Sequence, residues 1–191
     1  MTPAELERKL DELIGGWEHE CVEFKEANDN FSTHDIGKYF SALANEANLR
    51  GHTSGWLVFG VENKRRVVVG TSYRDGHERL MSLKHQIAQG VDPSTTFADI
   101  HVLMHPQGRV VLFEVPAAPR GMPIAWQRHF YARDGESLVG LDLAKQDAIR
   151  GQGGLEDWSA AICPKATTDA LDPDAFREAR DIFVRKYADR L

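Results

Sequence analysis

The most constraining stretch of this 191-residue chain is a continuous apolar run, Trp56 to Val61, bounded by glycine and polar residues. A short apolar run between turn signals is typical of a buried strand, too short for an ordinary helix. A polar turn at residues 63–65 then leads to a second apolar segment, residues 67–70. We predict that the two segments form a hairpin, so the chain has to build a sheet around them.

A mixed acidic and basic strand precedes this run. At the two-residue period of a strand, Glu23 and Lys25 share a face with Cys21, while Val22 and Phe24 lie on the other. A carboxylate can hold a divalent cation and a lysine can neutralise a phosphoryl oxygen, so the pair suits chemistry on phosphate. The alternative is a solvent-facing edge strand with an ordinary surface ion pair.

Helical periodicity separates the strands. A helix over residues 3–13 begins with a proline in its first turn, and a second, capped by Ser32 or Thr33, ends at Gly51 and Gly55. Further helices are predicted over 78–88, over 142–150 and from Pro173 onward. Residues 100–105 and 110–115 form a second hairpin and 129–133 a short strand. The predicted fold class is α/β of the α+β kind, a mixed, mostly antiparallel sheet with packed helices.

Glycine residues divide the chain. Residues 151–154 contain three glycines and are the best linker candidate. We therefore predict one domain over 1–150 and a linker with a C-terminal helical extension over 151–191. The last helix displays Phe176, Ile182, Phe183 and Tyr187.

Composition restricts the functional class. The formal net charge is −6, which argues against a passive nucleic-acid coat but leaves room for local basic clusters at 64–66, at Arg120 and at 128–133. The two cysteines show no CxxC spacing, and HExxH and phosphate-binding-loop motifs are absent. No apolar run is long enough to span a membrane and the first residues lack a signal-peptide core, so the cytoplasm is the expected location.

Four ordered motifs resemble the Schlafen AlbA-type domain family. They lie at Glu18 to Lys25, Ile36 to Asn45, Gly55 to Asn63 and Val68 to Gly70, and residues 130–137 are similar to the motif that closes the family's domain. The resemblance covers roughly residues 17–150. It implies an α/β domain that binds nucleic acid.

In the animal branch the resemblance implies a metal-dependent endoribonuclease with two glutamates and an aspartate. By motif the glutamates are Glu18 and Glu23, Lys25 joins them as a catalytic residue, and Asn63 stands where the aspartate would be. An asparagine supplies no charge, so magnesium or manganese would be held more weakly. The residues expected to contact nucleic acid are Lys38, Lys64, Arg65, Arg66, Tyr131 and Arg133.

Other functions stay open from the sequence. The pair Glu23 and Lys25 also resembles half of a restriction-type nuclease site. A noncatalytic DNA-binding module of a bacterial transcriptional regulator and a partner-docking domain are further alternatives. Animal Schlafen proteins resemble two such domains in tandem, whereas this chain carries one, so we expect a homodimer in which Phe176, Phe183 and Tyr187 provide apolar surface.

Overall fold

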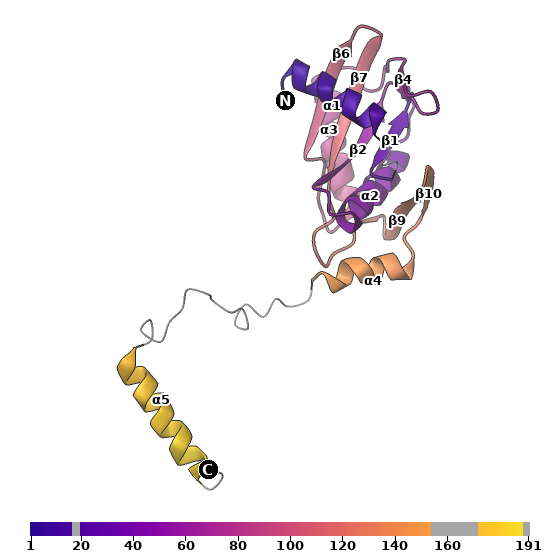
Figure 1. Ribbon diagram of the computed structural model, residues 1–191. Helices are drawn as coiled ribbons and strands as arrows, with labels where there is room; N and C mark the ends of the chain where they lie inside the picture. The colour runs from indigo at the N-terminus through magenta and orange to yellow at the C-terminus, as the bar shows by residue number, and fades with distance from the viewer. Residues whose placement is uncertain (17–19, 154–171, 189–191) are drawn as a thin grey trace. The chain divides into compact units, whose positions relative to one another are not determined.

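The computed structural model describes residues 1–16, 20–153 and 172–188. The chain separates into two compact units, residues 1–154 and 155–191. The first unit carries the sheets (Figure 1). In the second, α5 (Pro173–Lys186) begins at Asp172, whose side chain accepts hydrogen bonds from the first turn.

The main sheet has four strands in the order β1-β2-β7-β6. These are β1 (Val22–Lys25), β2 (Ser54–Phe59), β6 (Asp99–His105) and β7 (Gly108–Pro116). β1 runs parallel to β2, and the other pairs are antiparallel, with Val22 opposite Trp56 and Ile100 opposite Phe113. The predicted fold class and the hairpin around residue 107 are confirmed.

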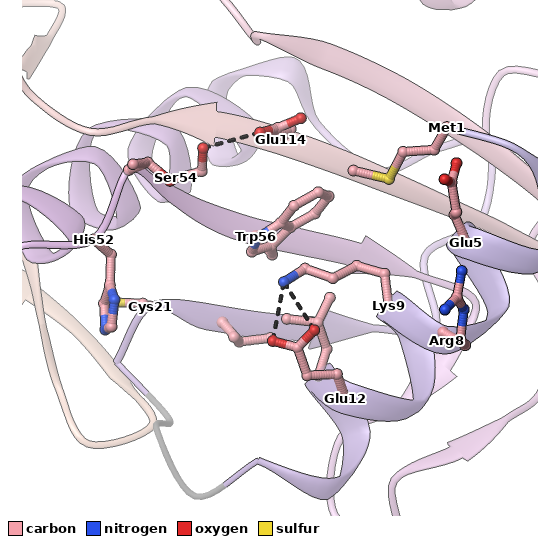
Figure 2. Close-up of a pocket in the computed structure, with 13 residues that line it drawn as sticks. Met1, Glu5, Arg8, Lys9, Glu12, Cys21, His52, Ser54, Trp56 and Glu114 are labelled. Carbon is pink, nitrogen blue, oxygen red and sulfur yellow. Dashed lines mark hydrogen bonds and ion pairs between the residues drawn. The ribbon is translucent and has the colours of Figure 1, made fainter.

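Helices cover both faces of this sheet (Figure 1). On one face lies α1 (Pro3–Gly15), which packs its leucines Leu6, Leu10 and Leu13 against Trp56 and its neighbours. A cavity of about 660 Å³ remains beside Trp56, where the Lys9 ammonium lies 5.2 Å from the indole centroid (Figure 2). On the other face, α2 (Thr33–Leu49) and α3 (His77–Gly90) bury a second apolar cluster.

A second sheet has the order β10-β9-β8-β5. Its strands are β5 (Val91–Asp92), β8 (Ala125–Trp126), β9 (His129–Asp134) and β10 (Ser137–Gly140). The helix α4 (Leu143–Gly151) follows, capped by Asp142. The strand predicted over 129–133 is confirmed as β9, whereas β5, β8 and β10 were not predicted because each has only two to four residues.

The first predicted hairpin is wrong in its pairing. β2 pairs only with β1 and β7, and the hairpin consists of the short strands β3 (Val61–Glu62) and β4 (Val67–Val68). Gly60 separates β2 from β3 at a φ of 95°, where a Cβ atom would meet the Arg109 carbonyl oxygen at 2.6 Å. The chain leaves the main sheet at this glycine, which the sequence pattern treated as part of one strand.

Among the helices of the described ranges, none is long and apolar enough to cross a membrane.

The indole of Trp126 lies against two glycines, Gly37 of α2 and Gly90 of α3, and fixes how closely the second sheet approaches these helices. A Cβ atom at Gly37 would come within 2.1 Å of the indole and one at Gly90 within 2.2 Å. Gly37→Ala should therefore destabilise the domain by about 1–3 kcal/mol, because the indole has to move.

Urea unfolding followed by circular dichroism measures this change. Gly15→Ala is the matched control, since no atom lies within 4 Å of its added Cβ. An equal effect of the two substitutions would contradict this packing.

Candidate nucleic-acid interface

A buried ion pair joins the two sheets. The guanidinium of Arg133 on β9 donates to Glu23 Oε2 on β1, and the two side chains are 1% and 2% exposed. The second Glu23 oxygen, Oε1, lies 2.7 Å from the ammonium of Lys25 on the same strand. Both carboxylate oxygens of Glu23 are thus occupied by cationic side chains. The predicted ion pair exists, but Glu23 lies in the interior and does not face solvent.

A second buried carboxylate, Glu46 of α2, extends the cluster. Its Oε1 accepts a hydrogen bond from the backbone N–H of Arg133 at 3.2 Å and another from the ammonium of Lys145 on α4. Arg50 at the end of α2 lies 3.9 Å from Glu46 and pairs with Glu20. Three glutamates and four cations from β1, α2, β9, α4 and their flanks therefore form one network.

Polar residues on the buried face of α2 fix β9 in this position. The Asn45 side-chain amide donates to the carbonyls of Ile124 and Tyr131 at 2.9 Å, and its oxygen accepts from the Ile124 N–H at 2.8 Å. The Ser41 hydroxyl donates to Ile124 at 2.7 Å and accepts from the Tyr131 N–H at 3.1 Å. Satisfied polar groups of this kind specify one docking geometry.

Lys25 occupies a half-buried position beside an aromatic ring. Its ammonium lies 5.0 Å from the Tyr39 ring centroid. Burial works to lower the pKa of Lys25, but hydrogen bonds to Glu23 and Tyr39 and the Glu23 charge outweigh it, so the net pKa is raised. Lys25 therefore stays cationic across the physiological range.

Other predicted contact residues lie on α2 and on the β3–β4 hairpin. Lys38, the residue before Tyr39 on α2, pairs with Asp35 at 3.0 Å, and this hydrogen bond raises the pKa of Lys38. The end of β1 meets the start of the β3–β4 hairpin, since Gly60 N–H donates to the Lys25 carbonyl at 2.8 Å. The turn of that hairpin carries exposed Lys64 and Arg65, and Arg66 lies over the Phe24 ring at 4.6 Å.

Burial corrects the expectation for Arg133. A guanidinium that is 1% exposed and bound to Glu23 does not reach a phosphate at the surface, so its position supports an interior role. Tyr131 shares its strand face but is partly exposed and packs against the core, so it presents an edge to solvent. Glu18 lies outside the described residues.

The described residues implied as metal ligands lack the free oxygens that a hard divalent cation needs. Such a cation prefers several free oxygens, mostly from carboxylates. Glu23 offers none that is unoccupied, and Asn63 lies in the β3–β4 turn and has no charge. Within the described ranges, no three His, Cys, Asp or Glu side chains gather as a metal site. These two residues do not fit the metal, and its binding stays a prediction.

The sequence reasoning missed most of the buried network. A cavity of about 760 Å³ is lined by Arg133 together with Glu46, Arg50 and Lys145. No role was predicted from the sequence for the last three. A signal was present, because Ser41, Asn45 and Glu46 interrupt the apolar face of α2 and are all buried. Polar residues at positions that helical periodicity assigns to the core indicate specific partners.

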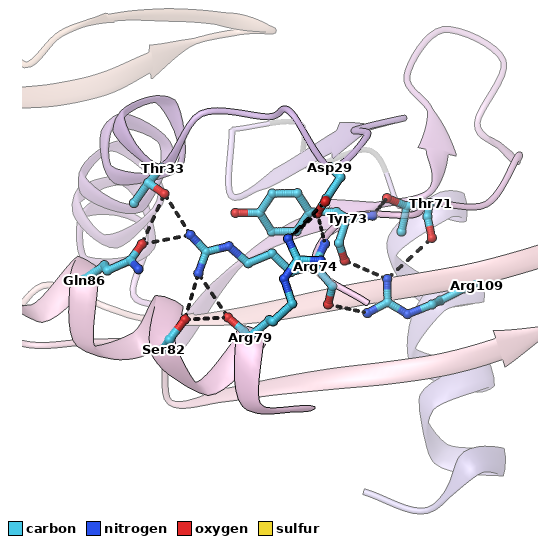
Figure 3. Close-up of polar contacts among 9 residues, drawn as sticks. All are labelled: Asp29, Thr33, Thr71, Tyr73, Arg74, Arg79, Ser82, Gln86 and Arg109. Atoms are coloured by element: carbon cyan, nitrogen blue, oxygen red, sulfur yellow. Dashed lines mark hydrogen bonds and ion pairs between the residues drawn. The ribbon is translucent and has the colours of Figure 1, made fainter. Parts of the chain in front are cut away.

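A second basic cluster serves a structural purpose (Figure 3). The Arg74 guanidinium donates to Thr33, Ser82, Gln86 and the Arg79 carbonyl, which clamps α2 to α3. The Arg109 guanidinium donates to backbone carbonyls of residues 71, 73 and 74. Both guanidinium groups hold the loop before α3 through these hydrogen bonds, and neither belongs to the proposed interface.

Comparison with known proteins identifies the family. The family model described as Schlafen, AlbA_2 matches residues 18–142, which is more than half of the chain. The chain belongs to the Schlafen AlbA_2 family. Glu23, Ser41, Asn45 and Arg133 all lie within the matched range and supply the buried contacts that the second sheet makes with β1 and α2.

Solved structures of similar proteins were also found. The DIP2311 protein of Corynebacterium diphtheriae shares 20% identity at a TM-score of 0.55, over 98% of this chain and 35% of that one. This chain thus spans about a third of that protein, and the likeness shows the fold. The N-terminal domain of a RecG-related protein from Nitrosomonas europaea shares 20% identity at a TM-score of 0.43, over 73% and 95% of the two chains. No curated protein matches.

The buried cluster predicts a large energetic coupling between the sheets. Arg133→Met should cost about 3–5 kcal/mol of stability, because Glu23 loses its buried partner, and Glu23→Gln should cost a similar amount. The double variant should lose less than the sum of the two. A double-mutant cycle by urea unfolding measures the coupling.

The exposed pair of Asp29 and Arg79, 2.9 Å apart, is the matched control, and Asp29→Asn should leave the unfolding midpoint unchanged. Strict additivity of the Glu23 and Arg133 effects would refute the buried coupling.

The raised pKa of Lys25 makes the stability of the folded domain depend on pH. A raised folded pKa means that this lysine stabilises the fold below its unfolded pKa of about 10.4, and that the contribution fades as pH rises through the folded value. The stability difference between the native protein and Lys25→Met should be flat from pH 6 to pH 9 and shrink at higher pH. A decline centred near neutral pH, measured by urea unfolding, would show that the lysine is not held as described.

Proposed function

We propose that this domain binds nucleic acid along a cationic strip that crosses the edge of β1. The strip, defined by Lys38, Lys25, Lys64 and Arg65, runs from α2 past the end of β1 to the β3–β4 turn, and Tyr39 and Tyr131 border it. The observation that carries the proposal is the position of Lys25: its ammonium sits on the ring of Tyr39, the residue after Lys38, and the end of its strand meets the β3–β4 hairpin. Cations interleaved with aromatic edges suit a phosphate backbone and its bases.

The acidic total charge is compatible with this strip. Three carboxylates near it are paired, Glu23 with Arg133 and Lys25, Asp35 with Lys38, and Glu62 with Arg65 at 3.8 Å. Lys64 brings an ammonium for which the described part of the chain shows no carboxylate partner, and its side chain is exposed. A local positive strip can therefore bind phosphate while the net charge keeps nonspecific affinity low.

Noncatalytic binding is the form of this function that the site favours. The charge of Glu23 is neutralised by two cations, and Asn63 is uncharged where the resemblance implies an aspartate. Neither side chain is therefore suited to bind the divalent cation that hydrolysis would need. The chain would then act as the nucleic-acid-binding module of a regulator. Metal-dependent cleavage of structured RNA is the second candidate, because Glu23 and Lys25 lie on one strand at the proposed cationic strip.

Binding is tested by fluorescence anisotropy with labelled tRNA, single-stranded RNA and duplex DNA at several salt concentrations. The affinity should fall with salt, and each of Lys25→Ala, Lys38→Ala and Lys64→Ala should lower the magnitude of the salt slope by about 0.7–0.9. Lys9→Ala on α1, where Lys9 pairs with Glu12 at 3.1 Å, is the matched control and should bind like the native protein. Binding to none of the three probes would point to a partner-docking domain.

Cleavage is tested separately with manganese and the same RNAs. Intact RNA in the native protein and in Asn63→Asp would support pure binding. Cleavage that Glu23→Ala abolishes would instead establish the endoribonuclease, provided that circular dichroism shows the variant to be folded.

A further inference from the structure

The longest strand at an edge of either four-stranded sheet in the described ranges is β6, and its outer side is open. β6 has seven residues and ends the main sheet, with β7 on one side and no strand on the other. The opposite edge strand, β1, has four residues and carries Glu23 and Lys25. An open edge of this length is a template for another strand, and proteins usually block it with lysine, proline or a bulge. β6 contains neither lysine nor proline.

Apolar side chains stand at this open edge. Val102 is 41% exposed and Met104 is 75% exposed, the largest exposed fraction among the exposed large hydrophobic side chains of the described residues. They share a strand face with Ile100, which is buried under α3. The apolar face of the sheet therefore extends beyond the helix that covers it, and ends at an unpaired strand.

The backbone of the same residues points outward. The Ile100 N–H donates to its neighbour's carboxylate, Asp99 Oδ1, at 2.8 Å and not to β7. In an antiparallel strand the N–H and C=O of one residue point to the same side and alternate along the chain. The backbone N–H and C=O groups that point away from β7 are therefore those of Ile100, Val102 and Met104. Two of these residues, Val102 and Met104, also carry the exposed apolar side chains.

We infer that β6 pairs with β6 of a second copy of this chain, antiparallel and around a two-fold axis at Val102. In this register Val102 meets its own copy, Ile100 meets Met104, and Asp99 meets His105. Each exposed apolar side chain gains an apolar neighbour, and the acidic end of the strand lies opposite a histidine. The two sheets then become one eight-stranded sheet with an isologous interface.

This register is complementary to itself, which is why a second copy is the occupant that we propose. A shift by one residue would turn Val102 and Met104 away from the matching face of the partner. The carboxylate of Asp99, which now caps one outward N–H, lies opposite His105 of the partner subunit after pairing, so it retains a polar neighbour.

Oligomeric state tests the inference in the full chain. Light scattering should give twice the monomer mass at micromolar concentration, and Val102→Lys should halve that mass, because two ammonium groups would meet on the axis. Val69→Lys, at another valine that is 47% exposed but lies outside β6, is the matched control and should stay dimeric. A monomer at all concentrations, or a dimer that Val102→Lys leaves intact, would overturn the inference.

Thiol cross-linking tests the register. With a short cross-linker, Val102→Cys should yield covalent dimers well above the background that the native cysteines give. Met104→Cys alone should not, because its two copies would lie about 14 Å apart along the strands. A mixture of Met104→Cys and Ile100→Cys chains should cross-link again. Equal yields from Val102→Cys and Met104→Cys, or a dimer that only Phe183→Glu in α5 dissociates, would refute pairing through β6.

Discussion

The arrangement of this domain depends on a buried arginine held between two buried glutamates. Arg133 binds Glu23 through its guanidinium and Glu46 through its backbone N–H, so that one residue of β9 contacts both the edge of the main sheet and the helix α2. Burying such charges is costly unless each finds a partner. Lys25 and Lys145 complete the pairing, although the Nε of Arg133 has no partner within the described residues.

The same cluster positions Lys25 on the surface that is proposed to bind nucleic acid. Glu23 draws Lys25 toward the sheet, and this leaves the ammonium half-buried on Tyr39 with its charge secured by hydrogen bonds. A lysine fixed in this way loses less side-chain entropy on binding phosphate than a freely rotating one. The structural anchor Glu23 and the proposed binding residue Lys25 thus lie on the same face of one strand, and a residue that sequence motifs associate with catalysis holds its neighbour in place.

Much of the fold could be predicted because local signals agree with it. The caps at Ser32, Asp142 and Asp172 begin helices where expected, and the hairpin between β6 and β7 follows its turn residues. The pairing of β2 could not be predicted, since the glycine that separates β2 from β3 is apolar and looks like part of the run. The short strand β5 pairs with β8, far away in the sequence, whereas β8 and β10 pair with the neighbouring β9 but are too short to show an alternating pattern.

The candidate site was predicted less completely than the fold. Motif spacing found Glu23, Lys25 and Arg133, but it cannot tell a buried ion pair from an exposed catalytic group, because burial depends on how the second sheet docks. Asn45 and Ser41 decide that docking through hydrogen bonds to backbone groups about 80 to 90 residues away. The dimer that was expected through α5 stays a prediction, and β6 offers a separate surface for it.

Glu23 anchors an ion-pair network in this structure, and both of its carboxylate oxygens are engaged by cations. Paramagnetic line broadening by manganese in the nuclear magnetic resonance spectrum of the native protein tests it most directly, since no substitution is needed. Substoichiometric manganese should leave the amide signals of residues 22–25 no broader than those of β7. Selective broadening of residues 22–25, reversed by a chelator, would contradict it and would restore Glu23 to a metal site.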